Sequence, residues 1–475
     1  MAPPALGLRA PRSAFAVLAI AALGAAVLHA VAGHGFPVPW SDEIDFLTPA
    51  VSLARHGSLN APQLGAAHGM FWMSDLYYFL LAPVLRVFPA TVDVARSVSF
   101  VAVVAAAAGF WTAARRFGAG STISALAVAL WLVSPRVVLA GNIARHEALL
   151  LAFLAWSLAG TASQHRVAAA SLAGFAAVLH PAGFAFAIIV LAANLRRRGR
   201  RTDLWEWAIG VALAGFVVFE LWHFGGNLSL AVDQLRFQAT RKASRGSSVP
   251  APFIGLAVLA AAVAVIRYRA SSRAPTVLFA GVAVAAVAVA QIGQEMWYQV
   301  YGLETAALCL VLAVLAFVAT QPAPGRARTS GAAVAAMAFL LLGVAGFQQP
   351  FYGMRFARHS QEWDAFVVSV RGELVAFDRS SPAPKTVVIN SLSGLPWPAE
   401  ADTVGDLRFV KETLVTEAPA GTRYELFART LCCDGEREPT PAGRVLAHVT
   451  STNKTFDATL IELAADPGKR AAVAR

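Results

Sequence analysis

The sequence predicts a polytopic α-helical membrane protein with a small α/β domain at its C-terminal end. Of 475 residues, 57% are hydrophobic and 14% are charged, whereas about a quarter of the residues in a typical soluble domain are charged. Apolar segments of about 18–22 residues recur along the chain, and a helix of that length crosses a bilayer. Charged and turn-forming residues become frequent only after Gln348, where short strand-like runs begin.

About eleven segments are long and apolar enough to be transmembrane helices. They are approximately residues 13–33, 93–114, 121–140, 146–162, 167–179, 181–195, 204–224, 251–268, 275–292, 299–320 and 329–346. No small-residue cleavage site follows the first segment, so we expect a retained span rather than a signal peptide. The short pair 167–179 and 181–195 is separated by Pro181. One long kinked helix is the alternative, but it would invert the charge pattern of the later loops.

Basic loops alternate with loops that carry less positive charge, and this alternation predicts the orientation of the spans. The positive-inside rule places the basic loops and the N-terminus in the cytoplasm, with the protein in the plasma (inner) membrane. Topology then explains the formal net charge of +11, and we expect a lipid bilayer rather than nucleic acid as a partner. The basic residues of these loops are Arg9, Arg12, Arg115, Arg116, His165, Arg166, the run 196–201, Arg267, Arg269, Arg273, Arg326 and Arg328.

The first outer loop, residues 34–92, contains an apolar segment that we do not count as a span. Met70–Phe88 carries Asp75 and Arg86. Counting it as a crossing would place the next basic loop outside and invert every loop after it. We therefore predict a re-entrant or juxtamembrane helix in this loop.

Residues 1–346 form the predicted transmembrane part, and residues 347–475 are long enough for a separate α/β domain. The number of spans predicts that this domain is extracytoplasmic. We expect an amphipathic helix from about His359 to Phe377, followed by strands at Thr386–Asn390, Arg423–Thr430 and Asp457–Leu463. The three cysteines, Cys309, Cys432 and Cys433, give neither a metal-binding pattern nor a disulfide framework.

Three carboxylates follow the first span at the membrane edge, in Ser41-Asp42-Glu43-Ile44-Asp45. They open a predicted helix, Asp42–His56. Acids at such a boundary can meet a lipid-borne substrate on one side and water on the other, so Asp42 and Glu43 are candidate catalytic residues. The alternative is structural, because the helix dipole favours acids in a first turn. In that case an apolar face lies on a bilayer surface and consists of Phe46, Leu47, Ala50, Val51 and Ala54.

Further ionisable and aromatic residues lie at the same outer depth of later spans. Such polar side chains are costly in a membrane and usually mark function. Together they predict a polar cavity open to the outside, formed by Arg145, His146, Glu147, His180, Glu220, His223, Glu295, Tyr298, Tyr301 and Glu304. The structural alternatives are a simple Arg145–Glu147 pair, a structural histidine before Pro181, a local Glu220–His223 pair, and an interfacial aromatic belt that includes Tyr298.

The order of these motifs resembles a known family. Asp42-Glu43 opens a helix that ends in His56-Gly57-Ser58-Leu59, and Leu76-Tyr77-Tyr78-Phe79-Leu80 follows. Ala144-Arg145-His146-Glu147-Ala148-Leu149-Leu150 and His180-Pro181-Ala182-Gly183 come later. In this order they resemble the GT-C glycosyltransferase superfamily, closest to the branch with the lipid A aminoarabinose transferase and bacterial relatives of protein O-mannosyltransferases. The resemblance covers about the first 200 residues and implies a GT-C-like fold.

The resemblance also implies an activity. Such enzymes transfer a sugar from a polyprenyl-phosphate donor at the outer membrane face to an acceptor hydroxyl of a lipid, glycan or protein. Asp42 would be the general base, Glu43 its immediate neighbour, and Glu147 the second acidic residue, where it orients donor or acceptor. We expect the reaction to require neither a cofactor nor a metal ion. A divalent ion bound between Asp42 and Glu147 is the alternative.

The departing lipid phosphate needs cations or N–H donors. Relatives often carry Lys-Pro-Pro before the Leu-Tyr-Tyr segment, but Met73-Ser74-Asp75 stands here, so the family's phosphate-binding lysine is absent. The outer-face candidates for this role are Arg145, Arg55, His68 and His180, and the wider substrate-binding set adds His146, Glu220 and Tyr298.

A transporter or flippase for a lipid-linked or small polar substrate is the alternative function. Such proteins usually contain internal repeats and ionisable groups near the middle of the membrane. This chain shows no convincing repeat, and its charged positions gather toward one face. A third hypothesis is a scaffold that binds envelope partners through its C-terminal domain. We favour the glycosyltransferase.

Overall fold

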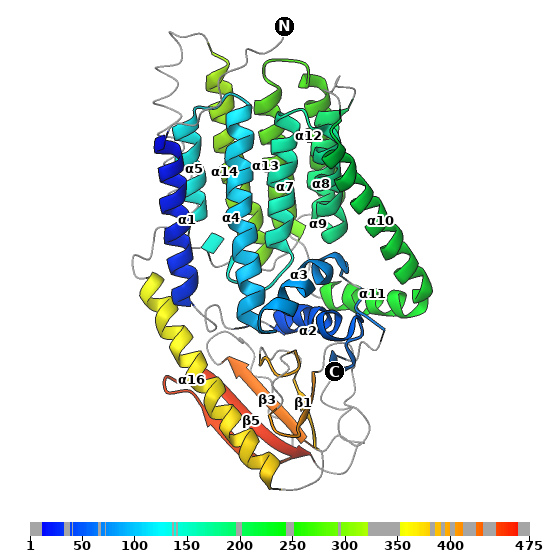
Figure 1. Ribbon diagram of the computed structural model, residues 1–475, viewed down its shortest axis with the longest axis vertical. Coiled ribbons are helices and arrows are strands. Elements are labelled where there is room, and N and C mark those ends of the chain that lie inside the picture. Colours follow the sequence, from blue (N-terminus) through cyan, green and yellow to red (C-terminus); the bar gives the residue numbers. More distant parts are fainter. Residues whose placement is uncertain are drawn as a thin grey trace.

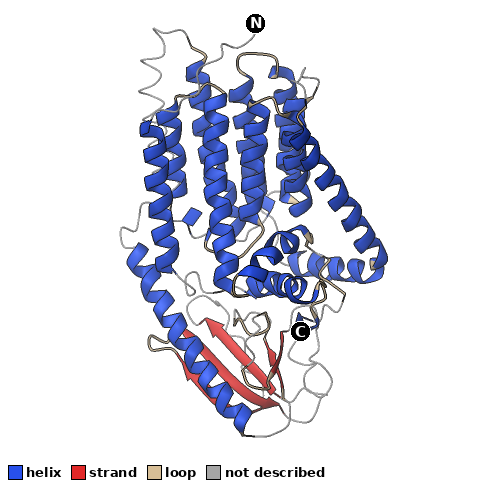
Figure 2. Cartoon of the chain, in the orientation of Figure 1, coloured by secondary structure: helices blue, strands red, loops and turns tan. Residues whose placement is uncertain are grey.

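The structure, a computed structural model, describes residues 12–32, 39, 41–64, 68–71, 73–134, 137–138, 141–195, 202–243, 251–292, 296–321, 352–380, 385–390, 395–399, 404–411, 424–430 and 443–463. A bundle of helices forms one part, and a sheet covered by one long helix lies against one end of it (Figure 1). In Figure 2 all strands, coloured red, lie in the second part, whereas helices, coloured blue, occur in both.

The bundle contains mostly long apolar helices. They are α1 (Arg12–Ala32), α4 (Val92–Arg116), α5 (Ser121–Leu132), α7 (Glu147–Ala162), α8 (Arg166–Leu179), α9 (Ala182–Asn194), α10 (Leu204–Gly226), α12 (Ala251–Tyr268), α13 (Ala274–Ile292) and α14 (Met296–Ala319). Within the described residues, 5 helices are long and apolar enough to cross a membrane, namely α1, α4, α10, α13 and α14. The chain is a multi-pass membrane protein.

Each span that we predicted before residue 320 coincides with a helix. The last predicted span, 329–346, lies outside the described residues, as does the predicted boundary between residues 346 and 347. The number of crossings therefore stays a prediction. One span was predicted too long, because α5 ends at Leu132 rather than near residue 140. Proline disfavours a helical residue before it and lacks an N–H, and Pro135 follows in this segment.

Small residues allow the bundle helices to approach closely. A Cβ on Gly109 of α4 would lie 2.8 Å from the Ala155 Cβ of α7, and one on Gly302 of α14 would lie 2.5 Å from the Ala286 carbonyl oxygen of α13. Backbones this close gain van der Waals contacts that a lipid environment does not otherwise supply. α10, by contrast, presents large apolar side chains such as Trp222 outward, as expected of a helix that faces lipid.

The break at Pro181 is confirmed as a turn between two separate helices. α8 ends at Leu179, His180 has extended backbone angles, and α9 begins at Ala182. The two helices pack against each other, since a Cβ on Gly183 would collide with the carbonyl of Ala176. Only glycine fits this contact.

Three helices lie across the end of the bundle that faces the sheet (Figure 1). They are α2 (Ser41–His56), α3 (Leu76–Val87) and α11 (Leu228–Ala243); a short 3-10 helix, η1 (Pro62–Leu64), lies between α2 and α3 in the chain. α3 contains 12 residues and lies beside α2, as expected for a helix of the first outer loop. α11 was not predicted, because its mixed composition gives no apolar run.

The prediction that the apolar face of α2 lies on a bilayer surface is wrong. Its side chains are buried in the protein core, where α2 packs against α3, α4 and η1. The residues concerned are Phe46, Leu47, Ala50, Val51 and Ala54. Protein rather than lipid covers this face, so α2 is a fixed structural element of the bundle end.

The C-terminal part is an α/β unit. α16 (Tyr352–Arg379) covers a mixed sheet of β1 (Thr386–Ile389), β2 (Arg408–Lys411), β3 (Tyr424–Thr430), β4 (Gly443–Thr450) and β5 (Phe456–Leu463). The strand order is β2-β1-β3-β5-β4. β1 pairs in parallel with β2 and β3, and the remaining pairs are antiparallel. Trp363, Phe366 and Val370 of α16 share a core with the sheet. β2 and β4 were missed, because β2 is short and β4 is an edge strand with exposed side chains.

Candidate active site

The first turn of α2 carries three acids, and each is bound by a basic residue from a different part of the chain. Glu43 is fully buried and accepts two hydrogen bonds from the Arg96 guanidinium of α4, from Nε at 2.9 Å and from Nη2 at 2.8 Å. The same carboxylate accepts the backbone N–H of Ala144 at 2.7 Å. Glu43 thus ties α2 both to α4 and to the segment before α7.

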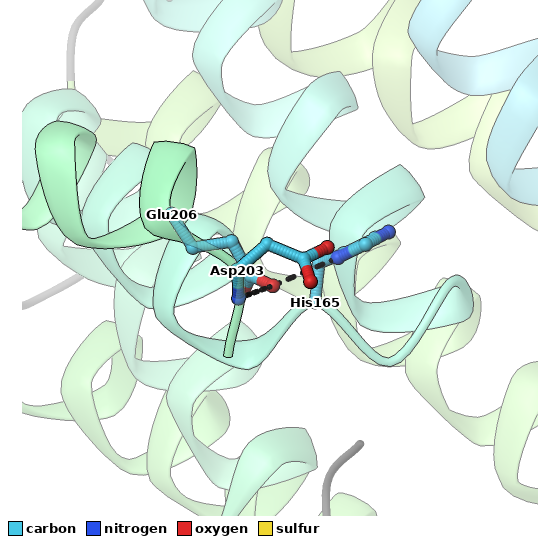
Figure 3. Close-up of side chains that lie close together, drawn as sticks. All are labelled: His165, Asp203 and Glu206. Carbon is cyan, nitrogen blue, oxygen red and sulfur yellow. Dashed lines mark hydrogen bonds and ion pairs between the residues drawn. The ribbon is translucent and has the colours of Figure 1, made fainter. Parts of the chain in front are cut away.

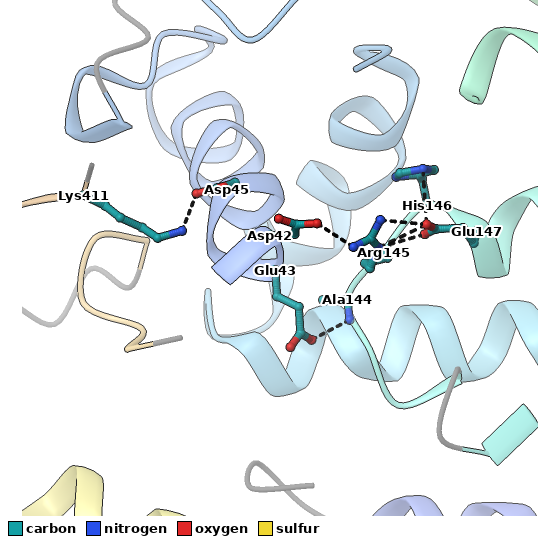
Figure 4. A network of polar contacts seen from close by, with 8 residues as sticks. All are labelled: Asp42, Glu43, Asp45, Ala144, Arg145, His146, Glu147 and Lys411. Atoms are coloured by element: carbon teal, nitrogen blue, oxygen red, sulfur yellow. Dashed lines mark hydrogen bonds and ion pairs between the residues drawn. The ribbon is translucent and has the colours of Figure 1, made fainter. Parts of the chain in front are cut away.

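Asp42 and Glu147 share one arginine (Figure 4). Arg145 Nη1 lies 2.6 Å from Asp42 Oδ2, and its Nη2 lies 2.9 Å from Glu147 Oε1. The side chains of Arg145 and Glu147 are 4% and 5% exposed, whereas that of Asp42 is 18% exposed. Asp42 is therefore the acid of this group that a substrate can reach.

The third acid binds the C-terminal sheet. Asp45 Oδ1 lies 2.6 Å from the Lys411 ammonium at the end of β2, and both side chains are almost fully buried. In Figure 4 the Lys411 side chain approaches α2 from the side opposite to Arg145. The first turn of α2 is thus bound by α4, by the segment before α7 and by β2.

Aromatic rings border the Asp42–Arg145–Glu147 group. The His146 and His180 rings stack with centroids 4.6 Å apart, and the Phe46 ring lies 5.3 Å from His146. Phe46 also lies beneath the Arg145 guanidinium, with Cζ 5.5 Å from the ring centroid. His180 Nδ1 accepts the Ala182 N–H at 3.1 Å, so a neutral His180 carries its proton on Nε2. The rings exclude water from one side of the arginine, which strengthens its ion pairs.

Tyr77 of α3 closes the group from another side. Burial raises the pKa of the Tyr77 phenol, and the carboxylates of Glu43 and Glu147 raise it further, against smaller opposing effects of Ser99 and Arg145. The phenol therefore stays protonated at neutral pH and can donate a hydrogen bond but cannot act as a base.

Six of the residues predicted for the site lie together, at the junction of α2, α7 and the turn before α9. They are Asp42, Glu43, Arg145, His146, Glu147 and His180. The acids of α2 bind distant segments, so the alternative in which they serve only the helix dipole does not account for their contacts. The Arg145–Glu147 pair of the structural alternative is present, and Arg145 extends it to Asp42.

The other predicted residues do not join this group. Arg55 is exposed near the far end of α2, about 20 Å along the helix from Asp42. His68 is exposed in a turn before α3. The side chains of Glu295, Tyr298 and Tyr301 lie outside the described residues, and Glu304 is buried in α14.

Glu220 belongs to a second polar group between α3 and α10. It accepts hydrogen bonds from the Ser74 hydroxyl at 2.6 Å and from the Asp75 N–H at 2.8 Å. His223 pairs with Asp75 at 2.6 Å rather than locally with Glu220. Burial raises the pKa of Asp75, and the hydrogen bond to His223 opposes that change. This group occupies the Met73-Ser74-Asp75 stretch, where the resemblance to the GT-C family leads one to expect a lysine.

Sequence reasoning missed two basic residues of the site. Arg96 is buried in the second turn of a span, and a charge in a membrane helix is costly without a partner, so its position was a usable signal. Lys411 gave no such signal, because a lysine in a charged domain is ordinarily exposed. Only the contact of β2 with α2 reveals its role.

Within the described part of the chain, one group of side chains has ligand atoms close enough to hold a metal ion, all within 4.8 Å of one another. It consists of His165, Asp203 and Glu206 (Figure 3). Glu206 accepts the Asp203 N–H at 3.4 Å and lies 2.9 Å from His165 Nδ1. These contacts bind the start of α8 to the start of α10. α10 runs from here to α11, so this group and the α2 site lie at opposite ends of the bundle (Figure 1).

No protein-family model and no curated protein matches the chain. Among solved structures, ArnT from Cupriavidus metallidurans in the apo state has a TM-score of 0.50 and 14% identity, over 94% of this chain and 97% of that chain. The fold that the two chains share is the GT-C glycosyltransferase fold. ArnT bound to undecaprenyl phosphate gives a TM-score of 0.50 and 13% identity, over 95% and 98% of the two chains. An oligosaccharyltransferase from Archaeoglobus fulgidus, tethered with an acceptor peptide, gives a TM-score of 0.43 and 14% identity, over 87% and 68%.

The GT-C resemblance that the motifs of the first 200 residues suggested is confirmed for the fold. The likeness to ArnT covers nearly the whole of both chains, so it includes the later helices and the C-terminal sheet. In this chain the Asp-Glu motif, the Arg-His-Glu motif and the His-Pro turn of the resemblance meet at one end of the bundle.

Proposed function

We propose that the protein is a membrane glycosyltransferase that moves a sugar from a polyprenyl-phosphate donor to an acceptor hydroxyl at the outer membrane face. The observation that carries this proposal is the partly exposed Asp42 carboxylate, held 2.6 Å from Arg145, at the sheet-facing end of a GT-C fold. The donor class is supported by the structure of ArnT bound to undecaprenyl phosphate, which has the same fold.

Asp42 is the proposed general base. Among the described residues its hydrogen-bond partner is Arg145, which binds Oδ2, so Oδ1 is available to an acceptor hydroxyl. The hydroxyl oxygen attacks the anomeric carbon and its proton passes to Asp42. The bond between that carbon and the phosphate oxygen breaks, and the electron pair leaves with the lipid phosphate. A positioned base of this kind contributes about 100-fold or more to the rate.

Arg145 has two proposed tasks. It orients the Asp42 carboxylate through one N–H, and its fixed positive charge stabilises the negative charge that develops on the leaving phosphate. Glu147 Oε1 lies 2.9 Å from Arg145 Nη2, so the plane of the guanidinium is fixed before substrate binds. His180 is the proposed second donor to the phosphate, through its Nε2 proton.

The proposal is tested with envelope vesicles from a bacterial host that expresses the protein, since these vesicles supply lipid, glycan and protein acceptors. A panel of undecaprenyl-phosphate monosaccharides is added, and released undecaprenyl phosphate and newly glycosylated products are measured by mass spectrometry. We expect release with at least one donor, and a loss of about 100-fold or more for Asp42→Asn. Normal release by Asp42→Asn would remove this residue as the base, and no release by the wild type with any donor would contradict the function.

Asp233→Asn is the matched control. Asp233 lies on α11, its side chain is 72% exposed, and its ion pair with Arg236 is 3.9 Å long. The same chemical change at this position removes one exposed carboxylate without touching the site. We therefore expect transfer at the wild-type rate from this variant.

A further inference from the structure

The first turn of α2 is bound by the C-terminal sheet through an ion pair that solvent does not reach. Lys411 Nζ lies 2.6 Å from Asp45 Oδ1, and the two side chains are 0% and 4% exposed. Asp45 is three residues from Asp42, so the two acids leave the same helical turn. The residues that pair are 366 positions apart in the chain.

A second contact accompanies this pair. β2, which ends at Lys411, packs against η1 of the first outer loop. Leu64 of η1 is fully buried and forms a small apolar cluster with Ala61 and Met70. The sheet thus touches the first outer loop at two points, one ionic and one beside an apolar cluster.

A buried ion pair contributes little net stability compared with apolar side chains of similar size, because both charges lose their hydration. It is nevertheless selective for geometry, since any displacement of β2 from α2 separates two buried charges of opposite sign. The pair therefore suits a role in fixing the position of β2 relative to α2. It stands opposite the contact of Arg145 with Asp42, so the turn is bound from two sides (Figure 4).

We propose that Lys411 and Asp45 are positioning residues, through which the C-terminal domain holds Asp42 in place for proton transfer. The sheet then belongs to the catalytic apparatus without contributing a group to the chemistry. The inference rests on the proposed function for its kinetic readout only, because the position of α2 is measurable without turnover. A displacement of the base by about 1 Å reduces the rate strongly while substrate binding changes little.

The test uses the full-length protein in lipid nanodiscs. Lys411→Met removes the cation that pairs with the buried Asp45 carboxylate, and the double variant Asp45→Asn with Lys411→Met removes both charges. Hydrogen exchange of the peptide 41–56 reports on α2, and peptides from β3 and β5 report on the sheet. Release of undecaprenyl phosphate gives kcat and KM with the donor that the wild type accepts.

We expect about tenfold faster exchange at the start of α2 in both variants, with unchanged exchange in β3 and β5. kcat should fall about tenfold or more, with the donor KM within about threefold of the wild type. If Lys411→Met does not fold, the double variant decides the question, since it leaves neither charge of this pair. Wild-type exchange in α2 together with wild-type kcat in the double variant would overturn the proposal.

Arg444→Met is the matched control within the same sheet. Arg444 of β4 pairs with Glu462 of β5 at 2.7 Å, a distance similar to that of the Lys411 pair, but its side chain is 74% exposed. We expect wild-type exchange in α2 and wild-type kcat from this variant. Slower turnover of Arg444→Met would mean that the loss of any ion pair of the sheet lowers kcat. If the wild type releases no undecaprenyl phosphate, the proposed function fails, while the exchange measurements still test the positioning role.

Discussion

Two carboxylate networks stand at opposite ends of the helix bundle, and they are built differently. At one end, Glu206 pairs with His165 and the N–H of Asp203, which lie 41 and 3 positions away in the chain. These partners belong to the ends of two neighbouring helices. At the other end, the acids of α2 take partners that lie 53, 103 and 366 positions away.

The difference distinguishes a network that caps the ends of helices from a network that builds a functional site. A local network stabilises the ends of helices that propensity and hydrophobicity already favour. A long-range network with several buried charges fixes the relative position of segments that lie far apart in the chain, at a cost in hydration. Such a cost is expected where the geometry of the groups is needed for chemistry.

The largest expected effect comes from breaking the most deeply buried pair of the α2 network. Glu43→Gln removes the Glu43 carboxylate from the Arg96 guanidinium, whose side chain is 1% exposed. We expect a loss of about 3–5 kcal/mol in the free energy of unfolding, seen as a lower thermal midpoint in detergent. The double variant Glu43→Leu with Arg96→Met should recover most of it. A Glu43→Gln protein as stable as the wild type would show that this pair does not hold α2 to α4.

The next effect concerns the arginine that joins two acids. Arg145→Lys keeps the charge but cannot bind Asp42 and Glu147 at once in the planar geometry that a guanidinium provides. We expect kcat for sugar transfer to fall about tenfold to a hundredfold, with a smaller effect on stability than Glu43→Gln. The measurement is the release of undecaprenyl phosphate. Arg444→Lys, at an exposed ion pair, should leave turnover unchanged, whereas full activity of Arg145→Lys would argue against a shared guanidinium.

The polar group of Asp75, Glu220 and His223 between α3 and α10 should make the stability of the protein depend on pH, with an effect of intermediate size. Burial raises the pKa of Asp75, so its protonated form favours the folded state. This contribution is complete below the ordinary aspartate pKa and is lost as the pH rises through the raised value. We expect Asp75→Asn, which cannot ionise, to lose less stability than the wild type as the pH rises. Thermal midpoints across this pH range test the expectation, with the exposed Asp233→Asn as the control. Parallel curves for Asp75→Asn and the wild type would contradict it.

The smallest effect is expected at the far end of the bundle. His165→Ala removes one hydrogen bond to Glu206, which retains its backbone N–H partners. We expect a loss of about 1 kcal/mol in stability and no change in kcat. A large fall in turnover would mean that this network acts on the site across the bundle, and the contrast between the two networks would then fail.

Much of the fold followed from local patterns. Spans such as 251–268 were predicted with correct bounds, because apolar composition and length decide a membrane helix. Pro181 predicted the break between α8 and α9, since proline removes a backbone donor. The helix α11 and the covered face of α2 escaped prediction, because both depend on which segments pack against them.

For the candidate site, the sequence marked its acids but not all of their partners. Asp42 and Glu43 stood out because carboxylates at a membrane edge are rare and costly. Their pairing with Arg145 and Arg96, and the pairing of His223 with Asp75 rather than Glu220, required the contacts of the folded chain. Periodicity fixes the face of a helix on which a residue lies, but not the partner that this face meets.

The sequence by itself determined the helical segments, the α/β character of the C-terminal part and the residue types available at one end of the bundle. These properties depend on hydrophobicity, chain geometry and proline, which act over a few neighbouring residues. Only the tertiary structure decided that the Lys411 charge meets Asp45 and that Arg145 joins two acids. Such pairs depend on the burial of charges brought together from distant segments, and burial is a property of the whole fold.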